Sequence, residues 1–155
     1  MSAFLLGGTF AATNFSPAPP PAAQAFDEHG AGINVGGIHV GAYIHSDGEF
    51  VYCVDMPLDA SVGMTAPALQ TVNELPSKTM NEAFVNGKTY TGISYPALRG
   101  DGLAELNYLL AKYGSTNNND QAAAVGLAVW KVRVPGSSAS CQEMYRDYAA
   151  LREQT

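Results

Sequence analysis

The sequence predicts an α+β fold, in which a small antiparallel β-sandwich or barrel-like sheet packs against a helical hairpin and a C-terminal helix. Between residues 30 and 95, runs rich in Ile, Val, Tyr and Phe are separated by Asp-Gly and Asn-Gly dipeptides, which signal tight hairpin turns. From residue 102 onward, apolar residues recur at helical spacing instead. The length of 155 residues, 46% of them hydrophobic, suffices for one core of ordinary size.

The first expected hairpin places a cysteine inside a strand. Asp47-Gly48 separates two β-rich runs, residues 30–45 and 50–55, because glycine tolerates the positive φ of a tight turn. Side chains alternate between the faces of a strand, and here both faces carry apolar groups, as in strands buried on both sides. One face would carry Val51, Cys53 and Asp55, and the other Phe50, Tyr52 and Val54. A second hairpin is expected at Asn86-Gly87.

Three helices are expected after the strands. The first covers residues 103–113, and Gly114 is expected to close it in the left-handed conformation. An Asn-rich turn leads to the second helix, which stops at Pro135-Gly136, and Lys131 and Arg133 suit the negative end of its dipole. The apolar stripes are Val125, Ala128, Val129 and Val132 on the second helix, and Met144, Tyr148 and Leu151 on the third.

The first 25 residues differ in character from the rest. The apolar run "AFLLGGTFAATNF", the segment "SPAPPPA" and the small residues "AQA" before Phe26 are typical of a secretory signal, although no Lys or Arg precedes the run. A disordered Ala/Pro-rich tail is the alternative. We expect a signal-like leader over residues 1–25, a main domain over residues 26–135, and a C-terminal helix over residues 136–155. The mature chain is expected to be secreted or at the cell surface.

Composition argues against several classes of partner. The net charge is −6 and the eight basic residues are not clustered, so we expect no nucleic-acid partner. No apolar segment is long enough to span a bilayer, so we expect no membrane insertion of the mature chain. The three histidines and two cysteines lack the spacing of a zinc site, and we expect neither a metal nor a cofactor.

Two motifs in this order carry a family resemblance: "VYCVD" over residues 51–55 and "AAAVGLAVW" over residues 122–130. The chain resembles, over residues 35–134, the thioester domains of Gram-positive bacterial surface proteins, particularly the compact actinobacterial ones. In that family a strand cysteine and a helix glutamine condense, with loss of ammonia, into an internal thioester. The resemblance therefore implies an adhesin module that reacts with a lysine amine on a host or matrix protein.

The resemblance assigns roles to particular residues. Cys53 matches the family's cysteine and Trp130 its helix tryptophan, and apolar packing by Tyr52 and Trp130 would keep water from the acyl group. Gly126 stands in the slot where the family has its glutamine. It either lets the cysteine strand approach closely or marks a lost glutamine.

Gln121 is the substitute nearest to that slot. It lies five residues earlier, a rotation of about 140° and a shift of roughly 7.5 Å on an α-helix. Gln121 also fits a capping box with Asn118. Asp55 is interpreted as a group that orients the crosslink or as an exposed carboxylate at the end of the strand.

Three functional hypotheses stay open on the sequence. The first is a covalent adhesin that uses Cys53 and Gln121. The second is a degenerate thioester-like domain that binds non-covalently or is structural, with Cys53 either a buried thiol or disulfide-bonded to Cys141. The third is a thiol hydrolase in which Cys53 is the nucleophile and His29, His39 or His45 is the base. We do not expect an enzyme, beyond a self-catalysed crosslink.

Overall fold

The computed structural model of the chain describes residues 4–6, 24–45, 48–56, 65–66 and 72–154. Within these residues the predicted α+β class is confirmed: three helices accompany antiparallel strands, and there is no closed barrel. Most of the signal-like leader, residues 7–23, lies outside the described residues, as does the first half of the turn at residues 46–47. Cleavage of the leader stays a prediction.

Five strands form the main sheet in the order β1-β4-β3-β2-β5, and every neighbouring pair is antiparallel. The strands are β1 (Phe4–Leu6), β2 (Gln24–Val35), β3 (Ile38–His45), β4 (Phe50–Cys53) and β5 (Thr65–Ala66). The predicted hairpin between β3 and β4 is confirmed, since Tyr43 pairs with Val51. Val51, Tyr52 and Cys53 are buried, so β4 is covered on both faces, which the sequence pattern left undecided.

The residues before this hairpin turn form two strands. β2 and β3 are joined at Gly36-Gly37, where φ is 61° and 87°, and the N–H of Gly37 donates to Oδ1 of Asn34 at 2.9 Å. The expectation of a single run over residues 30–45 is therefore wrong. Two consecutive glycines supply the positive φ values that a tight turn requires, and the chain reverses there.

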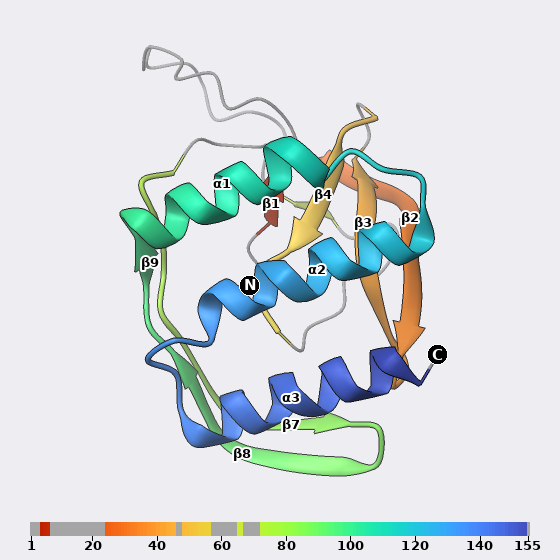
Figure 1. Cartoon of the computed structure of the whole chain (residues 1–155). Helices are drawn as coiled ribbons and strands as arrows, with labels where there is room; N and C mark the ends of the chain where they lie inside the picture. Colours follow the sequence, from red (N-terminus) through yellow and green to blue (C-terminus); the bar gives the residue numbers. More distant parts are fainter. Residues whose placement is uncertain (1–3, 7–23, 46–47, 57–64, 67–71, 155) are drawn as a thin grey trace.

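Two further pairs of strands lie outside the main sheet. β6 (Glu74–Leu75) pairs with β9 (Leu98–Arg99), and β7 (Lys78–Val85) pairs with β8 (Lys88–Tyr95). The turn between β7 and β8 is Asn86-Gly87, with φ of 47° and 79°, so the second predicted hairpin is confirmed. Helix α3 lies along the β7–β8 ribbon (Figure 1).

The helices are α1 (Asp101–Tyr113), α2 (Asn119–Arg133) and α3 (Ala139–Glu153), close to the predicted ranges. The predicted left-handed cap at Gly114 is wrong, because its φ is −70° and its N–H continues the helical pattern to the carbonyl of Leu110. Gly114 is buried, and its carbonyl accepts a hydrogen bond from the Tyr52 hydroxyl at 2.8 Å. Contact with β4, rather than a left-handed turn, sets the conformation of the chain there.

Helix α2 lies at the centre of the fold, between α1 and α3, and packs on β2 and β3 (Figure 1). Side chains from the sheet and all three helices meet in one core, where the rings of Trp130 and Tyr148 pack edge to face with centroids 5.2 Å apart. The buried residues of α2 are Ala122, Ala123, Val125, Gly126, Leu127, Val129, Trp130 and Arg133.

Candidate functional site

The two motifs that carry the family resemblance meet in space. Cys53 ends β4 and is 5% exposed, and its carbonyl accepts a hydrogen bond from Nε1 of Trp130 on α2 at 2.8 Å. The Cys53 thiol donates to the backbone carbonyl of Asp55 at 3.5 Å. Strand β4 and helix α2 are thus connected at the backbone of Cys53, the cysteine of the first motif.

Asp55 is a buried carboxylate rather than an exposed one at the end of a strand. It is 3% exposed; its Oδ1 accepts from the Tyr95 hydroxyl at 2.9 Å and its Oδ2 from Nζ of Lys78 at 3.1 Å. Burial, reinforced by the charge of Asp55, raises the pKa of Tyr95. The Asp55 carboxylate therefore connects the end of β4 to the β7–β8 ribbon. The Cys53 thiol bonds to the backbone carbonyl of Asp55, not to its carboxylate.

Tyr52 and Trp130 both belong to the hydrophobic core. Tyr52 is fully buried and its hydroxyl reaches the end of α1, and burial raises its pKa to about 12. Side chains alternate along a strand, so Tyr52 points away from the face that carries Cys53. Of the two aromatic residues expected to exclude water, Trp130 donates a hydrogen bond to the backbone carbonyl of Cys53.

Gly126 allows a close approach, but to β3 rather than to the cysteine strand. A Cβ atom at this position would lie 3.2 Å from both the backbone nitrogen of Gly41 and Cγ1 of Val40. Those distances are shorter than ordinary van der Waals contact between carbon atoms. The expectation that β4 is the approaching strand is wrong, and a larger side chain in the glutamine slot would require β3 to shift.

Gln121 lies in the first turn of α2 and is exposed. Its N–H donates to Oδ1 of Asn118 at 2.8 Å, but the N–H of Asn118 donates to Oγ1 of Thr116 at 3.1 Å. Only the Asn118 half of the predicted capping box is therefore formed. The side chain lines a surface groove of about 490 Å³ with Leu109, Tyr113, Ala124, Val125 and Ala128.

The structure does not bring Cys53 and Gln121 together. Nine residues separate Gln121 from Trp130, a rise of about 13.5 Å along an α-helix. Gln121 faces solvent beside α1, whereas Cys53 is buried beside Trp130. Gln121 is thus an exposed residue at the start of α2, whereas the contact of α2 with Cys53 is made by Trp130, near the end of the helix.

The alternative partners of Cys53 are also placed elsewhere. Cys141 is a buried thiol on α3, and burial raises its pKa. The backbone N–H of His45 donates to the carbonyl of Glu49. Glu49 precedes Cys53 by four residues, a distance of about 13 Å along the strand, so the backbone of His45 lies well away from Cys53. His39 stacks on His29 with ring centroids 4.3 Å apart. Cys53 and Cys141 are therefore not joined in a disulfide in this structure.

Sequence reasoning missed the position of Arg133. It was interpreted as a cation at the end of a helix dipole, yet it is only 3% exposed and lies in the core. A signal was present: Arg133 follows Val125 and Val129 at intervals of four residues and so continues the buried stripe of α2.

Across the described ranges, no three His, Cys, Asp or Glu side chains are grouped so that they could hold a metal ion. No helix in the same ranges is long and apolar enough to cross a membrane. Comparison with protein-family models, with curated proteins and with solved structures gave no match.

Proposed function

We propose that the chain is a thioester-domain-like module of an exported surface protein that binds its partner non-covalently, with Cys53 kept as a buried thiol. The observation that carries this proposal is the packing of Gly126 against β3, in the slot where a reactive glutamine would have to stand. The only glutamine near that motif, Gln121, faces solvent beside α1.

The resemblance is supported by the way its two motifs pack. Trp130 and Cys53 are 77 residues apart in sequence, yet the indole N–H of Trp130 donates to the Cys53 carbonyl. Two short motifs that coincide by chance need not touch. The partner that the resemblance implies is a host or matrix protein, met outside the cell that exports the chain.

A covalent adhesin is the second candidate, and the same contact favours it. In that chemistry Sγ of Cys53 attacks the side-chain amide carbon of a glutamine and ammonia leaves, giving the thioester. A lysine amine of the partner then attacks the acyl carbon, an amide forms, and the thiol of Cys53 is released with its proton restored. For Gln121 to serve, the first turn of α2 would have to rearrange toward β4.

Binding to an immobilised extracellular-matrix extract distinguishes the two candidates. The wild type and Cys53→Ser are each incubated with the matrix and then washed with buffer and with a denaturant. We expect equal retention of both chains in buffer and complete release of both by the denaturant. Wild-type chain that survives the denaturant while Cys53→Ser is removed would overturn the non-covalent proposal, and absence of retention in buffer would remove the matrix as the partner.

A further inference from the structure

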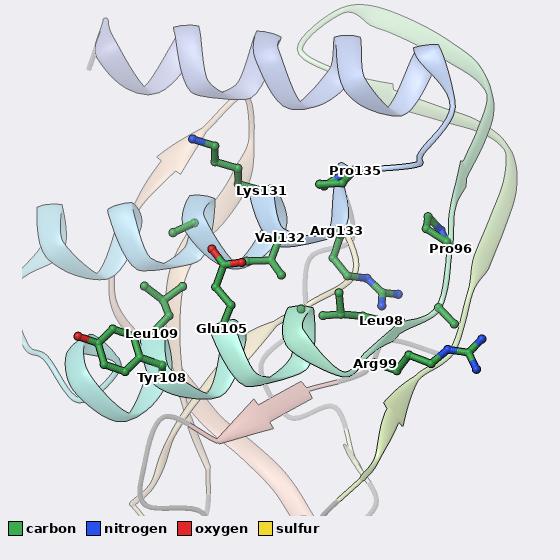
Figure 2. Close-up of a pocket in the computed structure, with 13 residues that line it drawn as sticks. Pro96, Leu98, Arg99, Glu105, Tyr108, Leu109, Lys131, Val132, Arg133 and Pro135 are labelled. Atoms are coloured by element: carbon green, nitrogen blue, oxygen red, sulfur yellow. The ribbon is translucent and has the colours of Figure 1, made fainter.

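A cavity of about 620 Å³ lies between α1, α2 and the segment that contains β9 (Figure 2). Its walls are largely apolar, with Leu98 from β9, Leu109 from α1 and Val132 from α2. The volume falls within the range of about 300 to 1,000 Å³ that is typical of sites for small ligands. The cavity also shares Leu109 and Ala128 with the groove beside Gln121, so apolar surface continues from one to the other.

The buried guanidinium of Arg133 is incompletely bonded at one wall of this cavity. It stacks on the ring of Tyr95, 4.6 Å from the centroid, and Nη2 donates to the carbonyl of Pro76 at 2.8 Å. Nε and Nη1 are buried, and no group in the described part of the chain accepts from them. A buried guanidinium is ordinarily paired with an anion, because removing an isolated charge from water is costly.

The nearest buried carboxylate is already engaged. Asp55 accepts from Lys78 with one oxygen and from Tyr95 with the other. The open N–H groups of Arg133 therefore stay at the cavity wall while the Asp55 carboxylate is bonded elsewhere. In Figure 2 the Arg133 side chain extends from the end of α2 toward Leu98.

Exposed charges of both signs stand at the rim. Lys131 on α2 adds positive charge, whereas Glu105 on α1 extends toward Val132 and opposes it (Figure 2). Arg99 also lines the cavity, but its Nε lies 3.4 Å from a carboxylate oxygen of Glu74. The chain as a whole carries a net charge of −6, so this positive end is a local feature.

We propose that the cavity binds a small amphipathic carboxylate. The apolar body of the ligand packs along Leu98, Leu109 and Val132, and its carboxylate lies at the end where the Arg133 guanidinium has two N–H groups without an acceptor in the described part of the chain. This site is separate from the surroundings of Cys53, and it does not depend on how the chain binds a protein partner.

Titration of the full chain with octanoate, octan-1-ol and octylammonium, followed by calorimetry, tests the proposal. The three probes share one apolar chain and differ in the charge of the end group. We expect octanoate to bind about tenfold more tightly than octan-1-ol, the effect of one charge-assisted hydrogen bond. Octylammonium is expected to bind more weakly than the alcohol.

Variants at the rim provide signed controls on exposed residues. Lys131→Gln should weaken octanoate binding and Glu105→Gln should strengthen it, each by about threefold, as expected for one exposed charge. Lys112→Gln removes a lysine that faces Tyr108 on α1 and does not line the cavity, and it should leave the affinity unchanged.

Three results would overturn the proposal: no binding of octanoate, equal affinity for octanoate and octan-1-ol, or rim variants that leave the affinity for octanoate unchanged. Equal affinity would mean that the cavity recognises only the apolar chain of the probe. The ring of Tyr95 and the carbonyl of Pro76 would then be enough to stabilise the buried Arg133 guanidinium. Arg133→Met should abolish the preference for octanoate if its circular dichroism matches the wild type. If that variant unfolds, the two rim variants decide.

Discussion

The contact between Gly126 and β3 bears on whether a reactive glutamine could stand at this position of α2. Glycine inside a helix costs about 1 kcal/mol relative to alanine, so its presence in α2 needs a compensating gain. The distances of 3.2 Å from a hypothetical Cβ to Gly41 and Val40 identify that gain as close packing of helix on strand. The residue that departs from the thioester pattern is therefore built into the core.

Gly126→Gln is expected to lower the free energy of unfolding by about 2 to 3 kcal/mol, because overpacking displaces β3 or α2. Urea denaturation measures the change. Ala124→Gln, at an exposed position of the same helix, is the control and should stay within about 0.5 kcal/mol of the wild type. If Gly126→Gln were as stable as its control, the packing explanation for this glycine would fail.

Tyr52 predicts a response to alkaline pH. Its pKa is raised from 10.0 to about 12 by burial, so the folded state favours the neutral phenol. The contribution to stability is complete below pH 10 and is lost as the pH rises from there toward 12. Tyr52→Phe should be less stable than the wild type at pH 8, through loss of the bond to Gly114, and should lose less stability between pH 9 and 11. Parallel pH profiles of the two proteins in urea titrations would contradict this.

Among the secondary-structure elements, the hairpins show which turns a sequence pattern can predict. Asn86-Gly87 was correctly predicted because a local turn signal was flanked by two apolar runs. Gly36-Gly37 was overlooked inside a run of similar character. The conformation of Gly114 could not be predicted from its neighbours, because it depends on Tyr52, which lies 62 residues away in the sequence. Local turn chemistry is readable, whereas contacts between distant segments are not.

The attachment of α3 to the β7–β8 ribbon predicts sensitivity to acid. Lys88 donates to Asp147 at 2.8 Å, Tyr90 also donates to Asp147, and these bonds hold the pKa of Asp147 below its usual value of 3.8. A carboxyl group whose pKa is lowered by folding stabilises the protein above its usual pKa, and this stability is lost as the pH falls from that value through the lowered pKa of the folded state.

Asp147→Asn should therefore be less stable than the wild type at pH 7 and should lose less stability between pH 5 and pH 3. Urea titrations at each pH measure both effects. Glu153→Gln, at an exposed position near the end of α3, is the matched control and should follow the wild-type profile. A profile of Asp147→Asn that also follows the wild type would show that this ionic contact does not fasten the helix.

For the whole molecule, the sequence predicted the α+β class, two of the hairpins and the three helices, but not the way the candidate site is assembled. Cys53 and Trp130 were placed on their correct elements by periodicity and motif. The burial of Arg133 and the packing of Gly126 on β3 depend on how α2 is rotated against the sheet. That rotation is set by the whole core, which no single stretch of sequence encodes.

The single core that packs the sheet against the three helices also predicts the reactivity of the two cysteines. Cys53 is 5% exposed and Cys141 is not exposed, and burial raises the pKa of the Cys141 thiol. The native protein should react slowly with an aromatic disulfide reagent, and both thiols should react at once after unfolding in urea. Absence of reaction after unfolding would indicate that the two are joined in a disulfide.

The intact mass of the chain, before and after incubation with methylamine, tests the central claim that Cys53 remains a thiol. We predict the mass that the sequence requires, unchanged by methylamine, in both the wild type and Gln121→Ala. A wild-type mass lower by one ammonia, which methylamine converts to its adduct and which Gln121→Ala lacks, would contradict this account. It would establish the covalent adhesin.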